Sequence, residues 1–219
     1  KTLMKYITEK DHVADFGCGV GGFLPTLSSL GKTVTGIDFS AKCIDIAKKH
    51  LKKFPNIRLV VHDMTKPLRL KCDVAVAANF LLSRDAALLE KMLKNMLAPV
   101  KKGGHAIIVT PALESMLLVY RKIAELRRKH GESHTRARSY VEKQMKKDIV
   151  SLADGVLLVG GVPTKHYLGE EMEAQLQKHG FGLVERYKIE YSWDTELDNI
   201  SRNEKGPYPW DWLFVGKKK

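Results

Sequence analysis

Short apolar runs alternate with helix-like patterns through the first half of the chain. Strand-like runs occur at 13–16, 33–38, 57–62, 72–78 and 105–110. Between them, apolar residues recur every three or four positions over 23–30, 41–53 and 85–97, which is the period of a helix with one buried face. Strands and helices in alternation predict an α/β protein with a mainly parallel sheet.

The pattern changes after Pro111. Two basic amphipathic helices are expected over 115–130 and 135–152, followed by a short glycine-rich strand over 155–162. A helix over 170–179 and two strands over 181–191 and 210–215 follow. We therefore expect one domain overall, with a core over 1–110, a helical cap over 111–165, and the remainder of the core sheet over 166–219.

Composition narrows the class of protein. The 219 residues are 44% hydrophobic and 28% charged, which is typical of a globular domain with a sizeable core. No apolar run approaches the ~20 residues of a membrane span. Cys18, Cys43 and Cys72 are widely spaced and form no CxxC pattern, which argues against a disulfide framework or a zinc site. A cytoplasmic protein with no metal and no membrane contact is expected.

The net charge of +12 raises the question of a nucleic-acid partner. The densest basic run covers 121–147 and holds ten Lys or Arg against three Glu. Such a run either follows phosphates or forms a solvated helix face. Because only Tyr140 and the preceding Tyr120 could stack on bases, the pattern favours the solvated face, and a nucleic-acid partner is possible but not favoured.

Three glycines at alternate positions follow the first predicted strand. Gly17, Gly19 and Gly21 let the backbone turn sharply and approach a ligand closely. Asp15 precedes them, and a carboxylate there disfavours a pyrophosphate but suits a ligand that carries an amine. Asp38 ends the next strand, 17 positions after Gly21, where it can accept two hydrogen bonds from a ribose diol. The pattern predicts a nucleoside site.

Residues 10–110 resemble the class I S-adenosylmethionine-dependent methyltransferases, and small-molecule members in particular. The resemblance implies a Rossmann-like, mainly parallel seven-stranded sheet with an antiparallel last strand and a helical insertion. It implies S-adenosylmethionine as cofactor, with Asp38 on the ribose hydroxyls, Asp63 and Met64 at the adenine, and Asn79 near the methionine part. The full set of cofactor-binding residues that we predict is Asp15, Gly17, Cys18, Gly19, Gly21, Asp38, Phe39, Ser40, Asp63, Met64 and Asn79.

The acceptor is predicted to be a small molecule, because an insertion after the fifth strand would roof the pocket. The Asp-Pro-Pro-Tyr or Asn-Pro-Pro-Tyr motif that some members use for amino groups of bases, glutamine or DNA is absent at 79–82. His166 is the candidate catalytic base, since its segment is expected to fold over the pocket; the alternative is a capping or packing histidine. Trp193, Trp210 and Trp212 either line an acceptor pocket or pack in the core.

Two other functions remain open from the sequence. The chain could be an RNA or protein methyltransferase that docks its substrate on 121–147. It could also be a non-catalytic subunit that binds the cofactor and serves mainly as a partner of another chain. The pattern does not predict the acceptor atom or the oligomeric state.

Overall fold

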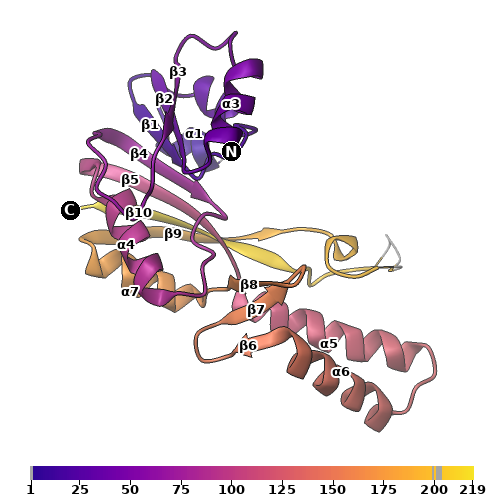
Figure 1. Ribbon diagram of the computed structural model, residues 1–219. Helices are drawn as coiled ribbons and strands as arrows, with labels where there is room; N and C mark the ends of the chain where they lie inside the picture. Colours follow the sequence, from indigo (N-terminus) through magenta and orange to yellow (C-terminus); the bar gives the residue numbers. More distant parts are fainter. Residues whose placement is uncertain (1, 199, 201–203) are drawn as a thin grey trace.

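A seven-stranded sheet forms the body of the protein, in the order β3-β2-β1-β4-β5-β10-β9 (Figure 1). The computed structural model describes residues 2–198, 200 and 204–219. The strands are β1 (His12–Phe16), β2 (Thr33–Asp38), β3 (Ile57–Val61), β4 (Cys72–Ala78), β5 (Val100–Pro111), β9 (Phe181–Glu190) and β10 (Trp210–Lys218). The first five pair in parallel, and β10 is antiparallel to both β5 and β9. The predicted Rossmann-like sheet with an antiparallel last strand is confirmed.

Helices cover both faces of this sheet. The short helix α1 (Thr2–Tyr6) is followed by Ile7, which packs with α2 (Leu24–Ser28) and α3 (Ala41–His50) on one face. The other face is covered by α4 (Ala86–Leu97) and α7 (Gly169–Lys178). The apolar side chains predicted to face inward on α4 are buried or half-buried. The result is a three-layer α/β arrangement, as the alternating pattern predicts.

Strand β10 is buried on both faces because it lies inside the sheet rather than at its edge. Trp212 and Phe214 pack toward α4 and α7, whereas Leu213 and Val215 pack toward the opposite face. Trp210 and Trp212 meet edge to face, with their ring centroids 5.8 Å apart. Trp210 and Trp212 belong to the hydrophobic core, so their packing role is confirmed. Trp193 is buried outside this core and lines a separate hollow of about 460 Å³.

The segment after β5 differs from the predicted helical cap. It forms two helices, α5 (Leu113–Lys129) and α6 (His134–Asp148), and then a three-stranded antiparallel sheet of β6 (Ile149–Ser151), β7 (Val156–Val159) and β8 (Val162–Lys165). The second helix ends four residues early because Ile149 becomes extended and pairs with Leu157. Gly160 and Gly161, both with positive φ, form the tight turn between β7 and β8. The insertion is thus mixed rather than helical.

We call residues 113–148 the arm, since α5 and α6 lie side by side and point away from the main sheet (Figure 1). Its base is held by the first turn of α5. The carboxylate of Glu114 accepts hydrogen bonds from Trp212 Nε1 (3.0 Å) and from the backbone N–H of Gly169 (3.2 Å). The Ser115 hydroxyl oxygen accepts one from the N–H of Trp210 (2.7 Å). Among the described residues, no helix is long and apolar enough to cross a membrane.

Replacing Glu114 by Gln should loosen the base of the arm. The amide that replaces one oxygen is a donor and would face the N–H of Trp212 or Gly169, so we expect a loss of about 1–3 kcal/mol in the free energy of unfolding. Urea denaturation measures it. Glu142→Gln is the control, since its pair with Arg138 is exposed and should matter by less than ~0.5 kcal/mol. Equal unfolding midpoints for the two variants would contradict the anchoring role.

Candidate functional site

A cavity of about 430 Å³ lies at the carboxyl ends of the parallel strands, where open α/β sheets bind their ligands. Its walls come from the segments that follow β1, β2, β3 and β4 and from one face of α4. The lining residues are Gly17, Asp38, Phe39, Asp63, Met64, Thr65, Asn79, Phe80, Leu82, Ser83, Leu88 and Met92. Six of them are predicted cofactor residues: Gly17, Asp38, Phe39, Asp63, Met64 and Asn79. A larger hollow of about 990 Å³ runs along the arm, but none of the predicted residues lines it.

The glycine turn after β1 requires glycine for two different reasons. Gly17, Gly19 and Gly21 all have φ between +54° and +82°, a region that other residues rarely adopt. A Cβ at position 17 would also lie 2.5 Å from the ring of Phe80. At position 19 a Cβ would meet nothing within 4 Å. The turn is therefore tightly packed at Gly17 and open at Gly19, which leaves room for a ligand beside the backbone.

Asp38 fixes the turn to the end of β2. Its carboxylate accepts one hydrogen bond from the N–H of Gly19 and one from the N–H of Ser40, both 2.9 Å long. The amides of Gly17 and Cys18 donate to the Ile37 carbonyl just before it. An oxygen of Asp38 that faces the cavity keeps further accepting capacity, because a carboxylate has about four lone-pair sites.

Five predicted cofactor residues do not line the cavity. Three of them support it from behind. Ser40 caps α3 by accepting a hydrogen bond from the N–H of Cys43. A Cβ on Gly21 would lie 2.7 Å from Leu51, so this glycine lets α2 pack on α3. Burial raises the pKa of the Cys18 thiol to about 12, so the thiol stays protonated. Gly19 contributes its amide to Asp38, and Asp15 lies beneath the turn.

Asp15 is a buried carboxylate without a partner. Its side chain is only 4% exposed, and in the part of the chain that the structure describes no hydrogen bond reaches it. Burial, and then the neighbouring Asp38, raise the pKa of Asp15 to about 7. A buried carboxylate of this kind is costly unless a cation or donor pairs with it. Its surroundings therefore fit a ligand that brings a positive charge.

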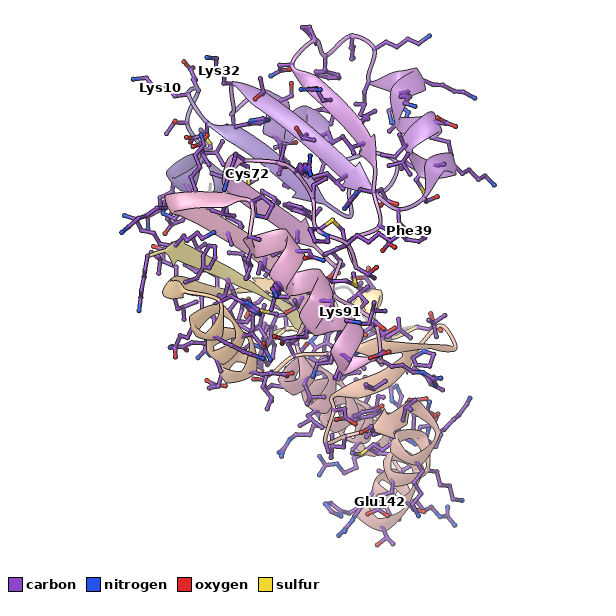
Figure 2. The ribbon with its side chains drawn as sticks, turned by 60° about the vertical axis from the view of Figure 1, so that its left-hand side comes forward. Lys10, Lys32, Phe39, Cys72, Lys91 and Glu142 are labelled. Atoms are coloured by element: carbon purple, nitrogen blue, oxygen red, sulfur yellow. The ribbon has the colours of Figure 1, made fainter. Side chains whose placement is uncertain are left out.

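The segment after β3 forms the opposite wall. The Asp63 carboxylate is exposed and accepts a hydrogen bond from the N–H of Thr65 (2.9 Å), which keeps the pKa of Asp63 below its usual value. Met64 is buried, and its carbonyl accepts a hydrogen bond from Asn95. Phe39 is 79% exposed at the ends of the parallel strands (Figure 2). Together they give an apolar slot with a carboxylate at its edge, which fits a purine ring.

The structure does not place His166 in the cavity. Its ring is buried, its Nδ1 lies 3.0 Å from the carbonyl oxygen of Thr164, and burial lowers the pKa of His166. No residue of 111–165 lines the cavity either, because the arm points outward. The β8 strand adjoins the site instead, where the N–H of Lys165 donates to the carbonyl of Leu82. The catalytic role of His166 stays a prediction.

Some lining residues escaped the sequence analysis. Leu88 and Met92 lie on the predicted inner face of α4, so the helical period was a signal for them. Leu82 and Ser83 follow β4, as Asn79 does. Asp211 does not line the cavity, but its exposure also differs from the prediction: alternation with two buried tryptophans predicts a solvated side chain, yet Asp211 is half-buried.

Comparisons with known proteins agree with this geometry. Residues 13–104 match the model of a methyltransferase domain family. The match covers the part of the chain that holds the glycine turn and strands β1 to β4, and over this part the chain is similar to methyltransferase domains. A ubiquinone biosynthesis O-methyltransferase from Coxiella burnetii is 32% identical over 116 residues, which is 49% of this chain and 48% of that protein. A demethylmenaquinone methyltransferase from Tropheryma whipplei is 29% identical over 102 residues, 47% of this chain and 42% of that protein. The chain thus spans about half the length of these curated relatives.

Solved structures share the fold over nearly the whole chain. A SAM-dependent methyltransferase from Methanosarcina mazei has a TM-score of 0.71 at 19% identity and covers 99% of this chain and 96% of its own. The magnesium protoporphyrin IX methyltransferase from Synechocystis PCC 6803, solved with bound SAM, has a TM-score of 0.57 at 12% identity and covers 100% and 73%. At these identities the likeness concerns the fold alone.

The raised pKa of Asp15 gives a stability test. A group whose pKa rises from 3.8 to about 7 on folding stabilises the protein most below pH 4 and loses that contribution as the pH rises to 7. The Asp15→Asn variant has no carboxyl group to titrate at this position. Its free energy of unfolding, minus that of the unsubstituted protein, should therefore increase by about 2 kcal/mol between pH 5 and pH 8. Urea denaturation without ligand measures this. A difference that does not change with pH would contradict the buried, unpaired state of Asp15.

Proposed function

We propose that the chain transfers the methyl group of S-adenosylmethionine to a small-molecule acceptor. The observation that carries the proposal is the unpaired, buried Asp15 beneath a glycine turn that Asp38 ties to β2. When bound, the cofactor supplies a methyl group already activated by a sulfonium. The protein then has to hold the acceptor close to that methyl group and in line with it.

Different residues around the cavity would bind different parts of the cofactor. Asp15 lies beneath the turn, where its carboxylate complements the charge of the amino-acid part. Asp38 would accept the ribose hydroxyls, while Asp63 and Met64 would meet the adenine. Asn79, at the end of β4, would adjoin the methionine part. Phe39 would cover the adenine ring. The other predicted residues would support the site, since their amides bond within the turn and to the end of β2: Cys18, Gly19, Gly21 and Ser40.

Two observations support a small molecule as the acceptor. The quinone-biosynthesis methyltransferases among the relatives act, by their names, on small molecules. The arm that would dock RNA or a protein is also less cationic than its composition indicates. Arg127 pairs with Glu132, Arg138 with Glu142, and Lys129 with Glu125 and Glu204. With Lys122, which pairs with Glu125 and Glu204, four of the ten cations of the basic run are thus paired within the described part of the chain.

Titration calorimetry with S-adenosylmethionine and S-adenosylhomocysteine tests the cofactor assignment. Both should bind the unsubstituted protein. Asp38→Asn keeps the shape but turns one acceptor into a donor, and we expect its affinity to fall about 10- to 100-fold. Asp45→Asn on α3 is the matched control and should bind as before, because Asp45 is exposed and, among the described residues, pairs only with Lys48. No heat with either ligand would overturn the proposed function.

Incubation with methyl-labelled S-adenosylmethionine and a cell extract tests the acceptor class. The extract is then separated into small-molecule, RNA and protein fractions. We expect the label in the small-molecule fraction, and none there with the Asp38→Asn variant at a cofactor concentration below its dissociation constant. Label in the RNA or protein fraction would replace the small-molecule assignment with one of the two macromolecular alternatives.

A further inference from the structure

Two hollows run along the arm, one on each side of the line where α5 meets α6. The first is the hollow of about 990 Å³ described above. The second has a volume of about 520 Å³ and is lined by α5 and α6 alone; we call it the arm groove. On α6, separate rows of residues at four-residue spacing line the two hollows: Tyr140, Gln144 and Asp148 line the first, and His134, Arg138 and Glu142 line the arm groove. The two rows therefore lie on different sides of the contact between the helices.

A segment of the chain itself meets the arm at the first hollow. Leu197, Ile200 and Glu204 line this hollow together with α5 and α6. The Glu204 carboxylate pairs with Lys122 Nζ (2.5 Å) and with Lys129 Nζ (3.1 Å) on α5. Lys122 is only 8% exposed, so the first of these pairs is shielded from water. On this side, the arm therefore binds a segment that supplies both apolar side chains and a carboxylate.

The arm groove has a similar apolar floor but no such segment beside it. The floor is formed by side chains of both helices: Leu117, Ala124, Val141 and Met145. Leu117 is 39% exposed, and no described residue outside α5 and α6 lines the groove. A row of apolar side chains along two packed helices is a surface on which a third, amphipathic helix can pack. Such a helix would remove Leu117 from water, which is favourable.

The rim of the arm groove is cationic. Arg121 and Arg128 line it from α5, and Arg138 lines it from α6. Arg138 pairs with Glu142 (2.7 Å), the one acidic residue of the groove. Among the described residues, no carboxylate pairs with Arg121 or Arg128, and Arg128 Nε donates only to the Ala124 carbonyl of its own helix (3.3 Å). The two arginines are seven residues and thus about 10 Å apart along α5, so carboxylates two turns apart on another helix can reach both.

We propose that the arm groove docks an acidic amphipathic helix of a partner protein, with apolar side chains on the floor and carboxylates on Arg121 and Arg128. The chain's own segment on the other side of the arm is the intramolecular counterpart of this mode of binding. A nucleic acid fits the groove less well, because its phosphates would leave the aliphatic floor uncovered. The one tyrosine of the groove, Tyr120, is buried and offers no surface on which a base could stack.

This inference goes beyond the proposed function, because the partner is not the methyl acceptor. The arm groove shares no residue with the cofactor cavity. Glu142, on its rim, lies on the part of the arm that points away from the main sheet (Figure 2). A helix docked in the groove would therefore leave the cavity open to the cofactor and to a small acceptor.

Fluorescence anisotropy with two designed peptides tests the docking. Both peptides have about 20 residues, which is long enough to form a helix on binding, and both carry the same leucines at helical spacing. The other positions are mainly glutamate in one peptide and mainly lysine in the other. At an ionic strength of about 0.15 M, we expect the glutamate peptide to bind at least about tenfold more tightly than the lysine peptide. Equal binding of the two peptides, or no binding of the glutamate peptide, would overturn the proposal.

Two double variants of equal charge locate the binding in the arm groove. Arg121→Glu with Arg128→Glu should lower the affinity for the glutamate peptide at least about tenfold, because like charges then face each other. Arg136→Glu with Lys143→Glu is the matched control. Both of these cations are exposed, neither lines the groove, and helical spacing places them on the opposite face of α6, so the peptide should bind this variant nearly as well as the unsubstituted protein. The same loss in both double variants would mean that the net charge alone attracts the peptide.

Leu117→Gln tests the apolar floor without a change of charge. The affinity for the glutamate peptide should fall several-fold, because the variant loses apolar area that the peptide would cover. An unchanged affinity would contradict the role of the floor. Thermal unfolding followed by circular dichroism, with equal midpoints for all variants, shows that they are folded.

Competition experiments check the class of the partner. Transfer RNA and vesicles of phosphatidylcholine and phosphatidylglycerol are each added to the protein with the bound glutamate peptide. If either binds more tightly than the peptide, and loses that affinity in the variant with Arg121→Glu and Arg128→Glu, the proposed protein partner is wrong. S-adenosylhomocysteine should bind every variant as it binds the unsubstituted protein. If it binds none of them while the peptide binds in the groove, the proposed function fails and the docking site stands.

Discussion

The turn that joins β1 to α2 is held by three hydrogen bonds to the end of β2, and the rest of the site depends on it. The carbonyl of Ile37 accepts from two turn amides, and Asp38 accepts from the N–H of Gly19. Asp38 also accepts from the N–H of Ser40, at the start of α3. Because parallel pairing sets β1 against β2 residue by residue, the register of two strands fixes the position of the turn. The glycines then keep it open on the side that faces the cavity.

Asp15 and Asp38 place negative charge where it lowers the stability of the ligand-free protein. Asp38 lies close enough to Asp15 to disfavour the ionisation of Asp15, and the chain supplies Asp15 with no partner among its described residues. A ligand that brings a cation and hydrogen-bond donors relieves the repulsion. A ligand that binds these carboxylates therefore also stabilises the folded protein. The turn should be most rigid when the ligand is bound.

The order and identity of the core elements could be predicted from the sequence, because their apolar periods are local properties. The cavity wall could also be predicted where residues directly follow strands, as Asp38, Asp63 and Asn79 do. The conformation of the insertion was harder to predict from the sequence. Ile149 and Val150 continue the helical period of the basic run, and the pairing of Ile149 and Ser151 with β7 makes this segment extended. Asp211 is half-buried in a strand that pairs with β5, where Asp211 lies opposite Pro111, and no local pattern encodes this pairing between distant parts of the chain.

The position of β10 also has a consequence for the order in which the protein can fold during synthesis. This strand is made after β9 and yet lies between β9 and β5, so the first five strands end in an uncovered edge until residues 210–218 have left the ribosome. Until then β5 exposes unpaired backbone groups along its length, a surface that can pair with other chains. Lys101 and Lys102 lie near the start of β5. Charged residues of this type disfavour the pairing of an uncovered strand edge with other chains.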